Sequence, residues 1–118
     1  MMETKFKLLS TTEKMIHYIN RQLINYPKKE IILKQSIEKN QYELLECIFA
    51  FNINQVSRIK EKYLKNYLVK LSMFDFFVRE SYHKKYLSKK QMESVTKLIV
   101  ESRKITYGLI KSETSKNV

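Results

Sequence analysis

With 118 residues and a formal net charge of +11, the chain is long enough for one domain with a single hydrophobic core. Its 43% hydrophobic and 30% charged residues exclude a disordered chain. One glycine and one proline exclude a strand-rich fold with many tight turns and favour a few long helices. The lysine excess favours a polyanionic partner, with nucleic acid the first candidate, although lysines can also form an inert solvated surface.

The chain lacks the features of an exported or membrane-spanning protein. Its start, Met1 to Lys7, has no apolar segment of the kind found in signal peptides, and no uncharged run approaches the ~20 residues of a membrane span. The single cysteine, Cys47, lies in an apolar run and is interpreted as a core residue. We therefore expect a cytoplasmic, reducing location and no membrane contact.

The first helix is expected over residues 10–26. Ser10 and Glu13 have capping-box spacing, in which the hydroxyl and the carboxylate satisfy free backbone amides at a helix start. Apolar residues then recur three and four positions apart, at Ile16, Ile19, Leu23 and Tyr26. The helix is expected to stop there, because the residue before Pro27 is displaced from the helical region.

The second helix is expected over residues 28–53. Pro27 suits its first turn, where the missing N–H is not needed for a hydrogen bond. The apolar stripe of this helix comprises Leu33, Ile37, Leu44, Ile48 and Phe51. Asn40 and Gln41 interrupt the stripe, either as a polar layer within the core or as an exposed turn.

The third helix is expected over residues 56–85, after a break at 52–55. Its apolar residues are close to a heptad seam and include Ile59, Tyr63, Leu64, Tyr67, Leu71, Phe74 and Val78. A helix of this length can cover a core from end to end.

The fourth helix is expected over residues 89–111, followed by a frayed tail at 112–118. Ser88 and Gln91 form a second capping box at its start. Short connections place consecutive helices next to each other in opposite directions. The sequence therefore predicts an all-helical, antiparallel up-down-up-down four-helix bundle that forms a single domain over residues 1–118.

The chain has few residues of the types that are used in catalysis or metal binding. The chain has two histidines, His17 and His83, no glycine-rich phosphate loop, and no cluster with metal-ligand spacing. Glu43 and Glu46 share a helix face, but without a histidine or metal partner we interpret them as solvated charges. We expect no enzymatic activity, no metal site and no cofactor.

Basic residues are concentrated on the third helix and the loop after it. Residues 55–90 contain ten basic residues against three acidic ones, whereas residues 31–54 contain two against three. A basic stripe on one helix face can neutralise phosphates in register without reading bases. The first three members of the predicted nucleic-acid-binding set share such a face through their spacing of four and three. The set comprises Arg58, Lys62, Lys65, Lys70, Arg79, Lys84 and Lys85.

Tyrosines are interleaved with these basic residues. Tyr63, Tyr67 and Tyr86 can stack on unpaired bases. At helical spacing, however, Tyr63 and Tyr67 are more typical of a core. Both interpretations stay open at the level of the sequence.

Several short motifs occur in the order and spacing of a known family. They are Tyr26-Pro27-Lys28, Leu44-Leu45 to Ala50, Lys70-Leu71, Val78-Arg79, Leu87-Ser88-Lys89-Lys90-Gln91, Lys97-Leu98-Ile99 and Gly108-Leu109-Ile110-Lys111-Ser112. Over roughly residues 6–112 the chain resembles the bacterial Avd-like four-helix-bundle family. This family includes accessory proteins of diversity-generating retroelements and proteins encoded in ribosomal-RNA intervening sequences.

The resemblance implies a homopentameric, barrel-like assembly with a basic surface. It also implies binding of RNA or DNA and association with a reverse transcriptase. Arg79 matches a basic position of the family's third helix, which makes it an expected contact residue.

Two alternatives from other classes stay open. Arg79 and His83 resemble the Arg and His pair of HEPN-type ribonucleases, although their spacing is one residue shorter than is usual there. An exposed helix end with a single histidine explains the same residues without catalysis. A third hypothesis is an oligomeric helical scaffold whose charge has no role in nucleic-acid binding.

Overall fold

The computed structural model describes residues 2–116 of the chain, with side chains from residue 6 onward. Over this range the elements are α1 (Met2–Leu23), the short 3-10 turn η1 (Lys28–Glu30), α2 (Ile31–Ile53), α3 (Ser57–His83) and α4 (Lys89–Lys116). No strand occurs among the described residues. The predicted all-helical class with four helices is confirmed.

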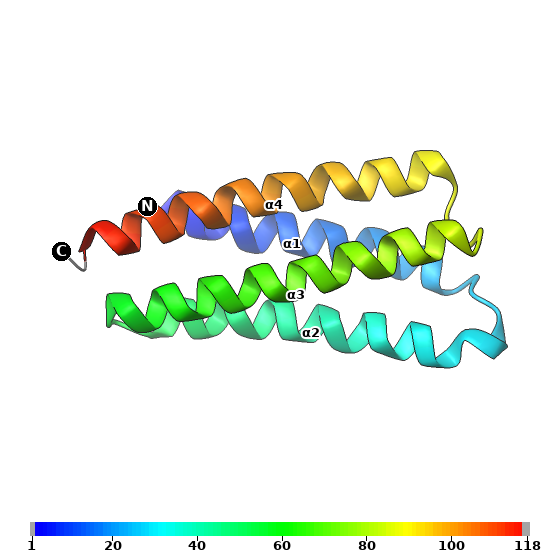
Figure 1. The fold of residues 1–118 in the computed structure, drawn as a ribbon, viewed down its shortest axis with the longest axis horizontal. Helices are drawn as coiled ribbons and strands as arrows, with labels where there is room; N and C mark the ends of the chain where they lie inside the picture. The colour runs from blue at the N-terminus through cyan, green and yellow to red at the C-terminus, as the bar shows by residue number, and fades with distance from the viewer. Residues whose placement is uncertain (1, 117–118) are drawn as a thin grey trace.

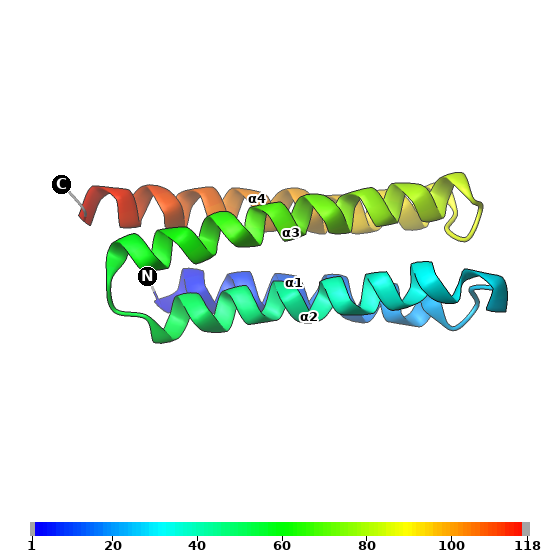
Figure 2. The same cartoon turned by 60° about the horizontal axis from the view of Figure 1, so that its bottom comes forward.

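The four helices lie side by side in two layers. Figure 2 shows α1 next to α2 in one layer and α3 next to α4 in the other. Extensive contacts join α2 to α3, α3 to α4 and α1 to α4, and fewer join α1 to α2. The resulting bundle measures 49 × 24 × 18 Å. The η1 turn and the α3–α4 connection lie together at one end of it (Figure 1).

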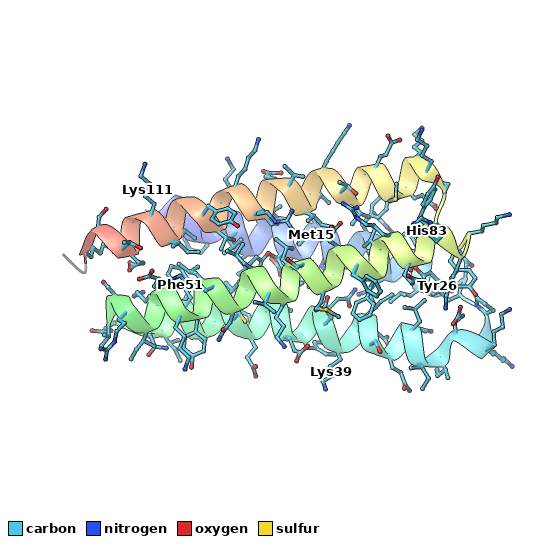
Figure 3. The ribbon with its side chains drawn as sticks, viewed as in Figure 1. Met15, Tyr26, Lys39, Phe51, His83 and Lys111 are labelled. Carbon is cyan, nitrogen blue, oxygen red and sulfur yellow. The ribbon has the colours of Figure 1, made fainter. Side chains whose placement is uncertain are left out.

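A continuous hydrophobic core joins the four helices. Each helix contributes fully buried side chains, among them Leu8, Met15, Leu44, Leu71, Phe74 and Val95. Met15, labelled in Figure 3, lies midway along the bundle. Burial of one such side chain contributes about 1.5–3 kcal/mol to folding. Tertiary packing can therefore override a local signal for the start or end of a helix.

Helix α1 begins earlier than predicted. The prediction of a start at Ser10 is wrong, because α1 begins at Met2 and Ser10 is an exposed residue within it. Leu8 is 0% exposed, and only a helix that extends before Ser10 carries this side chain into the core. The next turn also faces inward, where the Thr12 hydroxyl donates to the Leu8 carbonyl at 2.8 Å and shares a 2.7 Å hydrogen bond with the Tyr67 hydroxyl.

The first connection also differs from the prediction on both sides of Pro27. α1 ends at Leu23, and Tyr26 lies outside the helix with its ring buried against Tyr86 at a centroid distance of 5.0 Å. Pro27 has extended backbone angles, φ −67° and ψ 152°, and precedes η1. α2 therefore begins at Ile31 and ends, as predicted, at residue 53.

The polar interruption in α2 is a layer within the core. Asn40 and Gln41 are each 3% exposed, which excludes the alternative of an exposed turn. The Asn40 side-chain amide donates to the Lys70 carbonyl of α3 at 3.0 Å. This bond crosses between two helices and favours one register of α2 against α3.

The predicted start of α4 is confirmed, whereas the predicted ends of α3 and α4 differ from those in the structure. The Ser88–Gln91 capping box is confirmed: the Gln91 amide N–H donates to the Ser88 hydroxyl at 3.1 Å, and the Ser88 N–H donates to Gln91 Oε1 at 2.8 Å. α3 ends at His83, two residues before the predicted end. The prediction of a frayed tail from residue 112 is wrong as far as residue 116, because Glu113 is 4% exposed and its helix continues. Residues 117–118 lie outside the described residues.

Candidate nucleic-acid interface

The seven basic residues predicted from the sequence lie in three different places along α3 and the loop after it. Arg58, Lys62 and Lys65 are exposed on one outward face of its first half and border a shallow hollow. We refer to these three as the outward ridge. Lys65 is bound to Glu61 of the same helix at 3.1 Å. From Arg58 to Arg79 the helix rises about 30 Å, at ~1.5 Å per residue, so these two residues cannot belong to one compact site.

Two further members of the set are directed toward acidic neighbours. Lys70 lies in the groove between α2 and α3 and contacts Glu43 Oε2 at 3.2 Å. Arg79 contacts Asp75 Oδ2 at 3.3 Å, one turn earlier on α3. Exposed ion pairs contribute only ~0–1 kcal/mol, so these contacts orient the two cations without preventing them from binding phosphate.

The outward face of α3 changes from basic to apolar side chains after Lys65. Val69, Met73 and Phe76 continue the same face and are 62%, 43% and 54% exposed. Large apolar side chains gathered on one surface are typical of a protein-contact surface. The outward ridge therefore ends where an apolar stripe begins. On this face of α3 only the three cations of the ridge are available to bind successive phosphates.

The three tyrosines considered from sequence have different environments. Tyr67 is 1% exposed and bonded to Thr12, so it is a core residue that cannot stack on a base. Tyr63 is half-buried, and the Lys62 ammonium lies 5.8 Å from its ring centroid. Tyr86 is half-buried in the α3–α4 connection, where it bonds to Glu30.

Glu30 ties the two connections at one end of the bundle together. Its carboxylate accepts a 2.6 Å hydrogen bond from the Tyr86 hydroxyl and lies 3.0 Å from the Lys84 ammonium. Lys84 and Glu30 are 54 residues apart in the chain. The contact therefore joins η1 to the α3–α4 connection, as the placement of Tyr26 and His83 at the same end in Figure 3 indicates.

The same contacts shift two pKa values. The hydrogen bond from Tyr86 and the neighbouring Lys84 ammonium lower the pKa of Glu30. The Glu30 carboxylate in turn raises the pKa of Tyr86 to about 12, because an ionised tyrosine would lose this hydrogen bond and face a like charge. The carboxylate and the neutral phenol stabilise each other at neutral pH.

The joined connections concentrate positive charge. η1 contributes Lys28 and Lys29, and the α3–α4 connection and the start of α4 contribute four more lysines; we refer to all six as the basic end. Its members are Lys28, Lys29, Lys84, Lys85, Lys89 and Lys90. All six are exposed. Only Lys84 and Lys85 of these six belong to the predicted site. Lys28, Lys29, Lys89 and Lys90 do not, and only the fold brings Lys28 and Lys29 near the others.

Two shallow grooves run from the basic end along the α3–α4 side. One, of about 500 Å³, is lined by Arg79, Tyr82, His83, Met92, Glu93, Thr96 and Lys97. The other, of about 540 Å³, is lined by Tyr82, His83, Lys85, Tyr86, Leu87, Ser88, Lys89 and Gln91. Tyr82 and His83 border both grooves. Their rings lie 5.7 Å apart in a tilted arrangement.

A metal-binding cluster and a membrane-spanning helix are both absent from the described residues. No group of three or more His, Cys, Asp or Glu side chains among them is placed to hold a metal ion. None of the helices in this part of the chain is long and apolar enough to cross a membrane. Cys47 is buried, as predicted, and burial raises the pKa of its thiol.

Comparison with known protein families, curated proteins and solved structures gives no match. The geometry of the chain itself therefore carries the functional argument.

Proposed function

We propose that this chain is a non-catalytic nucleic-acid-binding protein that holds phosphates at the basic end of its helical bundle. The observation that carries the proposal is the Glu30 contact, which brings η1 and the α3–α4 connection together and so gathers six exposed lysines. Glu30 contacts Lys84 and also attracts Lys29, so a single carboxylate is shared within a group of six exposed lysines.

Lysine ammonium groups bind phosphate as point charges and release condensed counterions from the nucleic acid. Binding of this kind depends weakly on base sequence and steeply on salt. The overall charge of +11 adds long-range attraction that speeds association. The basic end is thus suited to an accessory role in which RNA or DNA is held regardless of sequence.

A salt titration tests the proposal. In the basic-end variant, Lys28, Lys29 and Lys89 are replaced by Gln; in the control variant, Lys39, Lys104 and Lys111 are replaced instead. All six positions are exposed, and Figure 3 shows Lys111 far from His83 along the bundle. We expect the basic-end variant to lower the slope of log affinity against log salt by roughly two to three, about one for each lost phosphate contact. Equal slopes for the two variants would leave only bulk charge, which is the scaffold hypothesis.

We also propose that the helices run up-down-up-down and that the bundle forms a homo-oligomer, with a pentamer expected from the family resemblance. Exposed apolar side chains of α2 support self-association: Tyr42, Phe49 and Ile53 are 72%, 51% and 78% exposed. Light scattering should give a mass several times the 14.3 kDa of one chain. A monomer at micromolar concentration would contradict this expectation.

The protein partner that the resemblance supports is a reverse transcriptase. The apolar stripe of α3, formed by Val69, Met73 and Phe76, offers a surface for it beside the outward ridge. Replacing Met73 and Phe76 by Glu should abolish co-purification of a reverse transcriptase expressed with the chain. Undiminished co-purification would assign that contact to another surface.

A second candidate function is a ribonuclease, because Arg79 and His83 line the same groove. Incubation with mixed RNA distinguishes it from the main proposal. We expect the RNA to stay intact with the wild-type chain and with His83→Ala. Metal-independent cleavage that is lost with either Arg79→Ala or His83→Ala would establish the ribonuclease instead.

A further inference from the structure

We propose that the two grooves around Tyr82 hold an unpaired nucleotide, with its base against the Tyr82 ring and its phosphate on Lys85. This inference rests on the proposed function and adds a ligand class to it, namely single-stranded RNA or DNA. The grooves of about 500 and 540 Å³ meet at Tyr82 and His83, and both fall in the ~300–1,000 Å³ range of small-ligand sites.

The lining of the grooves matches the parts of a nucleotide. Tyr82 and Met92 are half-buried, so an aromatic ring and an apolar side chain are accessible in the groove of about 500 Å³. An aromatic side chain beside a basic groove is the usual arrangement for binding unpaired bases, because every base has a flat face that can stack. Lys85 and Lys89 line the groove on the side of the basic end and supply cations for the phosphates.

The backbone of Lys85 gives independent support. Its φ of 68° lies in the left-handed region, where glycine is strongly favoured. The residue ends α3 in a Schellman motif: the Tyr86 N–H donates to the Ser81 carbonyl at 2.8 Å, and the Lys85 N–H donates to the Tyr82 carbonyl at 2.9 Å. A lysine at a position suited to glycine costs stability, and its exposed ammonium beside the groove is consistent with the phosphate contact that we assign to it.

A double-stranded nucleic acid cannot place a base in these grooves. Its bases are paired and stacked, so their faces cannot reach the Tyr82 ring, whereas an unpaired base can leave its strand and enter a groove. The grooves should therefore add affinity for single strands beyond the electrostatic attraction that both forms share. This difference separates the inference from the general phosphate binding proposed above.

Fluorescence anisotropy tests whether the grooves prefer single strands. The three labelled probes are an oligo-U RNA, an oligo-dT DNA and a duplex. Each has about ten nucleotides per strand, which is near the size of known single-strand binding sites. We expect at least one single strand to bind more tightly than the duplex. Tyr82→Ala should weaken single-strand binding by roughly 5- to 150-fold and leave duplex binding unchanged, while Tyr82→Phe retains the affinity. The matched control is Tyr107→Ala on α4, a tyrosine that is 57% exposed and lies beyond the last groove-lining residue, Lys97, so we predict no effect.

Lys85→Gly keeps the experiment decisive if Tyr82→Ala does not fold, because glycine fits the backbone at this position. It should weaken single-strand binding and lower the salt slope by about one. Equal binding of single strands and duplex, or wild-type affinity in both Tyr82→Ala and Lys85→Gly, would overturn the nucleotide site. The proposed phosphate binding at the basic end would still hold if the basic-end variant had a lower slope of log affinity against log salt than the control variant. Phosphate binding at the basic end would fail if the two variants had the same slope.

Discussion

Lys85 combines an unfavourable backbone conformation with an exposed charge. Its left-handed φ of 68° costs about 1–2 kcal/mol for a residue with a side chain. Glycine removes this strain but loses about 0.5–1 kcal/mol through its larger freedom in the unfolded chain. Because strain relief is the larger effect, we predict that Lys85→Gly raises the free energy of unfolding by up to about 1.5 kcal/mol.

Urea unfolding measures this change. The matched control is Lys39→Gly, at an exposed position inside α2, where glycine should lower the free energy of unfolding by about 1 kcal/mol. A destabilised Lys85→Gly would show that the lysine side chain supports the connection. The assignment of Lys85 to phosphate contact would then lose its argument from strain.

Glu30 and Tyr86 make folding stability depend on pH at both ends of the scale. The pKa of Glu30 is lowered below 4.5, so its contribution is present above that value and is lost as the pH falls through the folded pKa. The pKa of Tyr86 is raised from 10.0 to about 12, so its contribution is complete below pH 10 and disappears between pH 10 and about 12. Burial also raises the pKa of Tyr26 and Tyr67, which adds to the loss at alkaline pH.

The variant Glu30→Gln isolates the pair from the other tyrosines. We predict that it lowers the thermal midpoint near pH 7, and that its difference from wild type shrinks as the pH falls below 4.5 and again between pH 10 and about 12. Thermal melts followed by circular dichroism across this range measure the difference. A difference that is constant with pH would mean that the Glu30 contact contributes nothing through its charge.

The two capping boxes show, at the scale of the helix, what a local pattern can and cannot predict. Ser10 and Ser88 have the same spacing to a downstream Glu or Gln, but only Ser88 caps a helix. The difference arises from the residues before each serine. Leu8 extends the apolar face of α1 into the core, whereas Ser88 follows the turn that Lys85 begins. Helix periods were predictable from sequence, and helix ends depended on tertiary packing.

This contrast gives a paired prediction. Ser88→Ala should lower the free energy of unfolding by about 1 kcal/mol, because the Gln91 N–H loses its hydroxyl acceptor. Ser10→Ala should change it by less than about 0.5 kcal/mol, since the exposed serine lies inside a helix that alanine favours. Chemical denaturation measures both. Equal effects would be inconsistent with the observed start of α1.

At the scale of the whole molecule, the sequence predicted four helices and a concentration of charge on α3 but not the surface that the charges form. Spacing correctly placed Arg58, Lys62 and Lys65 on one face. It could not reveal that Lys70 contacts Glu43 on α2, or that Glu30 holds η1 beside Lys84. Both contacts join segments that are distant in the chain, so the spacing of residues within one helix cannot predict them.

Phosphates can bind at either of two basic surfaces of the bundle, the basic end or the outward ridge, and a salt titration distinguishes them. In a ridge variant, Arg58, Lys62 and Lys65 are replaced by Gln, and its salt slope on a single-stranded probe is compared with that of the basic-end variant. We predict that the slope decreases by roughly two to three in the basic-end variant and by less than about one in the ridge variant. The reverse order, with the larger decrease in the ridge variant, would place the phosphate-binding surface on the outward face of α3 and contradict phosphate binding at the basic end.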